Sequence, residues 1–137
     1  MHRKSARTLA SLFESSRAVA RAATMEEALE VVTRCAGEVF GVSECVAYEL
    51  DPDNDALIAR AMWERTPSGW DKLGVPTPLA EDPMSRGVLK SGHAYLGRLS
   101  DPQLDPVSRA DLEKWGEKSC LTVSMLSVDG PTGLLNL

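Results

Sequence analysis

The end of the chain constrains the fold most, because residues 119–137 have the pattern of a β-hairpin around which other elements must pack. Along this segment large apolar side chains alternate with small, partly polar ones. The large ones are Leu121, Val123 and Met125, and the small ones are Cys120, Thr122 and Ser124. A period of two predicts a strand that buries one face, here the face with the large side chains. Turn residues follow at Asp129, Gly130 and Pro131, so the chain is expected to return as a second strand.

The second strand of this hairpin, 134–137, runs to the last residue of the chain. A sheet that stops in the middle of an element is typical of a piece of a longer protein. We therefore expect further segments after residue 137, and expect the element that would close this layer to be missing.

Length and composition indicate one soluble domain, 1–137. The chain has 137 residues, 43% of them hydrophobic and 26% charged, which suffices for one core of ordinary size. Its net charge of -5 gives a nucleic-acid partner no electrostatic support. The three cysteines show no metal-binding spacing and are typical of thiols in a reducing compartment. Without a long apolar run we expect no membrane insertion and a cytoplasmic location.

Two helices are predicted at the start. In 5–23, apolar residues recur at spacings of three and four, which predicts an amphipathic helix (region 1–23) ahead of a core, 24–137. Thr24 and Glu27 form a capping box, and Gly41 suits a left-handed cap at the other end of a second helix. The apolar face expected on that second helix consists of Ala28, Val32, Cys35, Ala36, Val39 and Phe40.

The rest of the chain alternates strands with broken segments. Period-two patterns predict strands at 44–50, 56–65 and 93–98, and helices are expected at 82–91 and from a Ser108 cap to 118, with Leu112 and Trp115 inward. Residues 66–83 contain too many prolines and glycines for one long element. The connections predict an α+β fold, an antiparallel sheet with helices packed on one face and loops and short helices on the other.

Several stretches together resemble a GAF domain, a PAS-related sensory module of bacterial signalling proteins. They are MEEALEVVTRCAGEVFGV, CVAYELDPDND, DPMSRGVLKSGHAYLGRLSDPQ and SCLTVSMLSVDGPTGLLNL. The resemblance implies a GAF-like fold and a domain that binds a small molecule and relays its presence to a downstream effector. The effectors of that family include kinases, cyclases, phosphodiesterases and phosphatases. It also implies a C-terminal helix that pairs with the first one, which would be absent here.

A homodimer is expected through the first helix. Its stripe is wide enough to serve both its own sheet and a partner helix, and the residues expected at the interface are Leu9, Leu12, Phe13 and Val19. A module that dimerises and relays without any ligand is an alternative that this stripe leaves open.

A ligand pocket is predicted between the loop-covered face of the sheet and residues 63–98. Pockets are usually apolar with a few convergent polar groups. The expected walls are Trp63, Trp70, Met84 and Tyr95, and the expected polar groups are Arg86, Thr122 and Ser124. Because two tryptophans gather near an arginine, we expect a small planar or anionic metabolite.

Catalysis is not expected, because the sequence contains no GxSxG, HExxH, P-loop or GxGxxG motif. The enzymatic alternative is a GAF-type free methionine sulfoxide reductase, for which Cys120 is the candidate thiol, although it lies inside a strand without a resolving partner. No metal or haem is expected, since His93 has no second ligand beside it. No bilin is expected either, because no Cys-His pair occurs.

Overall fold

The computed structural model describes residues 2–137, and Met1, the first residue of the expected domain 1–137, lies outside the described residues. The described elements, in chain order, are α1 (His2–Arg21), α2 (Met25–Phe40), β1 (Glu44–Asp51), β2 (Ala56–Glu64), β3 (Pro76–Pro78), the 3-10 helix η1 (Leu79–Glu81), α3 (Pro83–Ser91), β4 (Tyr95–Arg98), α4 (Pro106–Trp115), β5 (Ser119–Ser127) and β6 (Gly130–Asn136).

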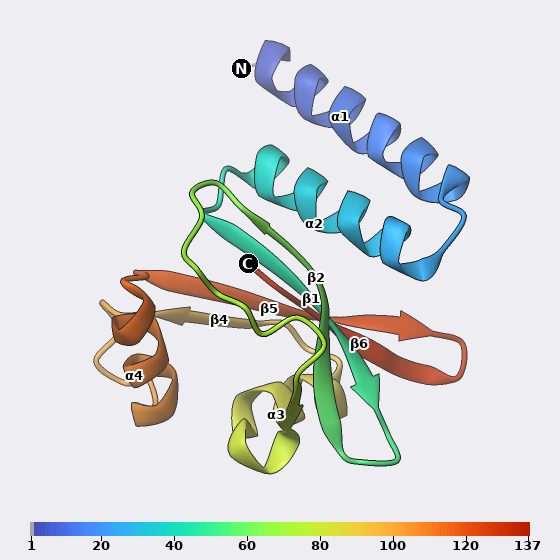
Figure 1. The fold of residues 1–137 in the computed structure, drawn as a ribbon. Coiled ribbons are helices and arrows are strands. Elements are labelled where there is room, and N and C mark those ends of the chain that lie inside the picture. Colours follow the sequence, from blue (N-terminus) through green and yellow to red (C-terminus); the bar gives the residue numbers. More distant parts are fainter. Residues whose placement is uncertain (1) are drawn as a thin grey trace.

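The strands form one sheet in the order β3-β2-β1-β6-β5-β4, and each neighbouring pair is antiparallel. The last strand, β6, therefore lies in the middle, between β1 and β5. Helices α1 and α2 lie together on one side of the sheet, and α3 and α4 lie on the other (Figure 1). The predicted α+β arrangement, with its antiparallel sheet between a helical layer and a layer of loops and short helices, is confirmed.

The predicted capping of α2 is confirmed at both ends. Thr24 is extended, and its Oγ1 accepts a hydrogen bond from the Glu27 N–H at 3.1 Å. The Glu27 carboxylate in turn accepts one from the Ala23 N–H at 2.8 Å. Gly41 has φ 65°, a left-handed conformation that a residue with a side chain adopts only with strain. These caps satisfy backbone groups that the helix itself leaves free.

The face that α2 turns to the sheet differs from the predicted one. The buried residues are Leu29, Thr33 and Gly37, whereas Phe40 is 64% exposed. Trp63 of β2 explains the difference, because its ring packs directly on Gly37, where an added Cβ would overlap the ring. Close approach of helix and sheet requires a residue without a side chain at this point.

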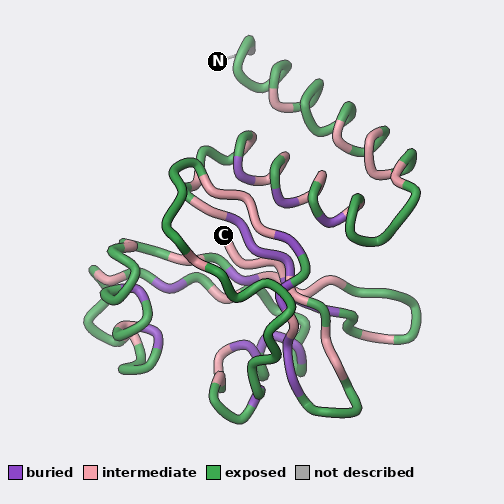
Figure 2. Tube along the Cα trace, in the orientation of Figure 1, coloured by how far each residue is buried: buried purple, intermediate pink, exposed green. Residues whose placement is uncertain are grey.

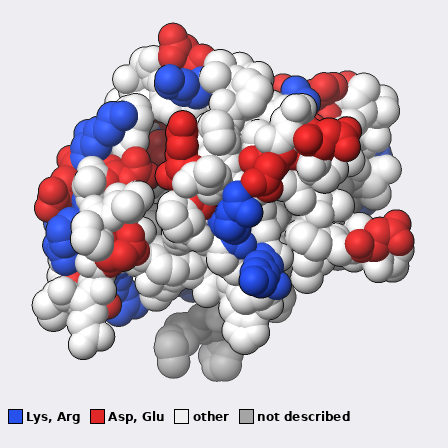
Figure 3. Space-filling view, turned by 90° about the horizontal axis from the view of Figure 1, so that it is seen from below, with Lys and Arg blue, Asp and Glu red and all other residues white. Residues whose placement is uncertain are grey.

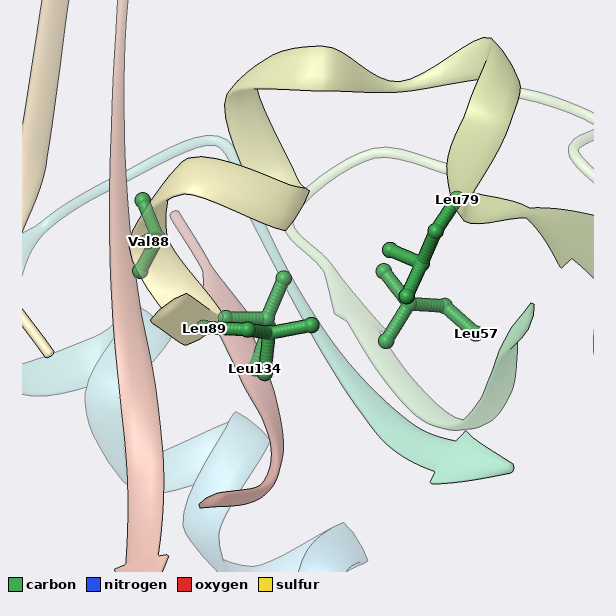
Figure 4. Packing of buried hydrophobic residues seen from close by; sticks show 5 residues of the cluster. All are labelled: Leu57, Leu79, Val88, Leu89 and Leu134. Atoms are coloured by element: carbon green, nitrogen blue, oxygen red, sulfur yellow. The ribbon is translucent and has the colours of Figure 1, made fainter. Parts of the chain in front are cut away.

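Leucines and a valine form the core on the opposite face of the sheet. The buried members are Leu57, Leu79, Val88, Leu89 and Leu134, and Tyr48, Leu50, Met84 and Tyr95 pack against them. Figure 4 shows Leu57 and Leu79 turned toward each other, and Leu89 and Leu134 belong to the same cluster. This cluster joins η1 and α3 to the strands.

Strand β5 is partly covered on both faces, and its most buried residue lies on the face opposite to the predicted one. Thr122, on the small-residue face, is 1% exposed, while Leu121 is 36% exposed. The reason is the unequal cover of the two faces. The small residues face the layer of α3, which packs on β5, whereas α2 packs on β1 and β2. Alternation in a sequence gives the two faces of a strand but not which of them the rest of the chain covers.

The fourth helix begins earlier than predicted. Its cap is Asp105, whose carboxylate accepts a hydrogen bond from the Ser108 N–H at 2.8 Å, and Pro106 occupies the first turn. Ser108 lies inside the helix and is buried. Leu112 points inward as predicted, but Trp115 is 44% exposed. The helix ends at Gly116, whose φ is 67°.

Helix α1 exposes its large apolar side chains. The partly covered residues of α1 are Thr8, Ser15, Ala18 and Val19, whose helical spacing marks the side that packs on α2. Leu9 and Phe13 are 68% and 66% exposed, and Leu12 is 41% exposed. Figure 2 shows α1 covered only along its side toward α2. Within residues 2–137, no helix combines the length and apolar character needed to cross a bilayer.

We expect Gly37→Ala to destabilise the fold, because the new methyl group must displace the Trp63 ring. Overpacking of this kind typically costs about 1–3 kcal/mol, which outweighs the gain in helix propensity of about 1 kcal/mol. Gly87→Ala in α3 is the matched control, since a Cβ there meets nothing within 4 Å and should be neutral or stabilising. Urea unfolding measures both changes. Equal behaviour of the two variants, or an undiminished loss from Gly37→Ala in a Trp63→Leu background, would contradict the packing.

Candidate functional site

A groove of about 570 Å³ lies between α3 and the start of α4. Each of the two helices that flank the groove begins with an Asp-Pro pair. The Asp82 carboxylate accepts from the Ser85 N–H at 3.1 Å, as Asp105 does from Ser108, and Pro83 and Pro106 stand in the first turns. A proline is favourable there, since its missing N–H would have no partner. Both prolines line the groove.

The groove has mainly apolar or small walls and a few polar groups. The walls are Pro83, Met84, Gly87, Val88, Ala94, Pro106 and Val107, and the polar groups belong to Ser91, His93, Tyr95 and Asp105. Such a lining, and a volume of several hundred cubic ångströms, are typical of small-molecule sites.

Tyr95 and Asp105 form the polar centre of the groove. The Tyr95 hydroxyl donates a hydrogen bond to Asp105 Oδ2 at 3.0 Å. Hydrogen bonds from Ser108, through its backbone first and then its side chain, lower the pKa of the Asp105 carboxyl, so this group is charged at neutral pH. Burial raises the pKa of Tyr95, which stays a neutral hydroxyl.

Two of the seven predicted site residues, Met84 and Tyr95, line the groove. Trp63 lies on the other face of the sheet, against Gly37. Arg86 is paired at 2.5 Å with Asp55, in the turn between β1 and β2. The side chain that favoured an anionic ligand is thus engaged elsewhere.

The other three predicted residues lie outside the groove lining. Thr122 is buried in the sheet and donates to Asn136 Oδ1 at 2.9 Å. Ser124 pairs with Leu134 in the ladder between β5 and β6. Trp70 is half-buried in the loop before β3, where its N–H donates to Ser68 Oγ at 3.2 Å.

Sequence reasoning missed Asp105 and Val107 as groove residues. A signal for them exists, because Asp105-Pro106 repeats the Asp82-Pro83 pattern that correctly predicted the start of α3. Ser108 offered a competing cap three residues later, and local sequence does not rank two such caps. That the two helix starts lie side by side follows only from the fold.

Carboxylates gather at the end of α4. Burial raises the pKa of Glu117 to about 8, and a hydrogen bond with Glu44, the charge of Glu44 and the charge of Asp111 act in the same direction. Cys120, half-buried next to Gly97, has its pKa raised by burial and further by Glu117, Asp111 and Asp105. Two carboxyl groups that share a proton tie the start of β1 to the segment before β5.

We expect this proton to make stability depend on pH. Below the ordinary pKa of 4.5 both the folded and unfolded chains hold it, and the contribution of Glu117 is fully present. Between about 4.5 and 8 only the folded chain holds it, so the free energy of unfolding falls as pH rises, and above that range the contribution is lost. Urea titrations at pH 5, 6.5 and 8 should show this fall. Glu117→Gln should flatten it and exposed Glu113→Gln should not; an unchanged slope in Glu117→Gln would contradict the shared proton.

The surface seen from below the view of Figure 1 carries charges of both signs. Seen from below the view of Figure 1, acidic and basic side chains alternate with uncharged ones over the described surface (Figure 3). A second hollow, of about 620 Å³, lies between α1 and α2, and its lining includes Arg17, Arg21, Glu27 and Glu30. Because opposite charges face each other there, this hollow favours no particular sign of ligand.

No protein-family model matches the chain, and no curated protein matches it. Solved structures do. The GAF domain of a phosphoenolpyruvate-protein phosphotransferase from Acinetobacter is 17% identical with a TM-score of 0.73, over 95% of this chain and 75% of that one. The corresponding domain from Coxiella burnetii is 18% identical with a TM-score of 0.72, over 94% and 75%.

The chromophore-binding domain of phytochrome P1 from Stigmatella aurantiaca is 13% identical with a TM-score of 0.77. The match covers 95% of this chain but only 50% of that one. Identities this low establish the fold and leave ligand and activity open. The resemblance to GAF domains found in the sequence is thus confirmed in three dimensions, and the chain has the fold of a GAF domain.

Proposed function

We propose that this chain is a small-molecule-binding sensory domain of a signalling protein. The observation that carries the proposal is the groove between α3 and α4, which has apolar walls and a charged, hydrogen-bonded Asp105–Tyr95 pair. One structure of the same fold is a GAF domain of a cyanobacterial phytochrome with phycoerythrobilin bound, with a TM-score of 0.77 and 16% identity. Because a domain of this fold binds a ligand in that protein, the fold is compatible with the binding of a different small molecule by this chain.

In this proposal the chain binds a ligand and does not catalyse a reaction. The candidate thiol of the enzymatic alternative, Cys120, is half-buried and has carboxylates as its charged neighbours. Reactive cysteines require the reverse, exposure and positive charge that lower the pKa. The surroundings of Cys120 therefore favour a structural thiol over a methionine sulfoxide reductase.

Filling the groove should abolish ligand binding without unfolding the protein. Gly87 lines the groove and has open space where a side chain would begin, so Gly87→Leu should place its side chain in the groove. Native mass spectrometry of the purified protein, followed by thermal-shift screening of a metabolite library, should find stabilising compounds for the wild type and none for Gly87→Leu. Lys90→Leu, on α3 but outside the groove, is the control. A library without any hit on the wild type, or hits that Gly87→Leu retains, would contradict the site.

We further propose that the signal passes through a homodimer formed by α1 to an effector of the kind that accompanies GAF domains. The face of α1 turned away from α2 carries Leu9 and Phe13, which in the isolated chain are 68% and 66% exposed, and Leu12, 41% exposed, lies at the edge of the side toward α2. Apolar side chains at this helical spacing are typical of a helix-helix interface. Val19, also predicted at the interface, is half-buried on the side toward α2.

Phe13→Glu and Leu9→Glu should weaken the dimer at least tenfold, because each places a charge in the proposed interface. Neither should unfold the chain, since both side chains are already exposed. Sedimentation equilibrium over a concentration series gives the dissociation constants. Val128→Glu, at the fully exposed tip of the β5–β6 hairpin, is the control for lost apolar surface. A wild-type protein that stays monomeric at millimolar concentration would contradict the proposal that α1 forms a dimer and passes the signal.

A further inference from the structure

The groove carries one formal negative charge and no opposing side chain. Among the described residues that line it, the ionisable ones are His93, Tyr95 and Asp105, and none is lysine or arginine. Asp105 is the member held in its charged form, because hydrogen bonds from Ser108 stabilise the carboxylate.

The two nearest candidate arginines in sequence have other partners. Arg86 of α3 is paired with Asp55. Arg109 of α4 donates to the Leu99 carbonyl at 3.1 Å and to the Asp101 carbonyl at 2.7 Å. Either side chain would have to give up these bonds to neutralise Asp105. The described contacts of Asp105 are instead those with Tyr95 and Ser108.

The hydrogen-bonding capacity left at the polar centre is that of acceptors. The Tyr95 hydroxyl donates its hydrogen to Asp105, so its oxygen can only accept a hydrogen bond from a ligand. The Asp105 carboxylate accepts from the Tyr95 hydroxyl and the Ser108 N–H and is also hydrogen-bonded by the Ser108 side chain, and as a charged group it can only accept from a ligand. A ligand group matched to this centre must therefore be a hydrogen-bond donor.

One further carboxylate acts on the same neighbouring strand. The charges of Asp111 and Asp105 both act on Cys120, which belongs to the strand that pairs with β4. A carboxylate or phosphate ligand would meet the like charge of Asp105, which is unfavourable.

On the condition that the groove is the ligand site proposed above, we infer that its ligand is a small organic cation. A primary ammonium, amidinium or guanidinium group donates to Asp105 and Tyr95, and an apolar body lies along Met84, Val88 and Val107. This assignment replaces the anionic metabolite expected from the sequence, because the arginine on which that expectation depended does not line the groove.

Three probes that share a phenyl ring and a short chain test the charge. They are 2-phenylethylammonium, 2-phenylethanol and 3-phenylpropanoate, titrated by NMR into the wild-type protein at neutral pH. The ammonium should bind at least tenfold more tightly than the alcohol, which corresponds to about 1.4 kcal/mol, and the propanoate should bind most weakly. Raising the salt concentration should weaken the binding of the ammonium probe alone, since salt screens a charge attraction at a partly exposed site.

Asp105→Asn should remove the preference for the ammonium and leave the alcohol unchanged. Asparagine is also a good helix cap, so α4 should keep its start, which circular dichroism checks. Asp101→Asn is the matched control, because Asp101 is a carboxylate of the same loop that does not line the groove. Its preference should equal that of the wild type.

Two results would overturn the inference, and only the second would also overturn the groove as a ligand site. Equal or reversed affinities of the three probes, all weakened by Gly87→Leu, would overturn the cation and leave the groove as a ligand site. No binding of any probe to the wild type, together with a metabolite library that yields no hit, would overturn the groove and the cation together.

Discussion

The fold depends on the pairing of β6 with β1. This pairing joins β3, β2 and β1 to β6, β5 and β4, so a strand from the end of the chain holds the two halves of the sheet together. The contact is close, since a Cβ at Gly133 would overlap the backbone oxygen of Tyr48. Next to it, Leu134 is 1% exposed and lies in the core under α3. Removal of β6 would leave that core without its centre and both central strands with open edges.

The two faces of the sheet are covered by different means. On one face α2 approaches closely through Gly37 and α1 packs only on the outer side of α2, so the large side chains of α1 find no place in the core. On the other face leucines from η1 and α3 fill the space over the strands. The first face thus presents an apolar helix surface to solvent, whereas the second leaves a groove where α3 and α4 begin.

The character of the groove follows from backbone requirements as much as from its side chains. An aspartate before a proline starts a helix, and in doing so it places a charged carboxylate at the mouth of an apolar space. At Asp82 the cap is completed by Ser85, whose hydroxyl donates to it at 2.5 Å. At Asp105 the Ser108 side chain forms the equivalent bond, and a tyrosine from β4, whose ring is part of the groove, adds another. The same local motif therefore yields a structural cap in one place and a candidate binding group in the other.

Local order was determined by the sequence itself. Helix caps at Thr24 and Gly41, the start of α3 and the strand pairs on either side of tight turns depend on neighbouring residues, so they were predictable, and their sum identified the GAF fold. Tertiary structure alone decided which faces are covered. Trp63 and Arg86 looked like groove residues because they are near it in sequence, yet strand alternation turns one toward α2 and an ion pair holds the other at Asp55. Asp105 and Tyr95 meet because the start of α4 lies beside β4, the edge strand of the sheet, a contact between elements that no local pattern encodes.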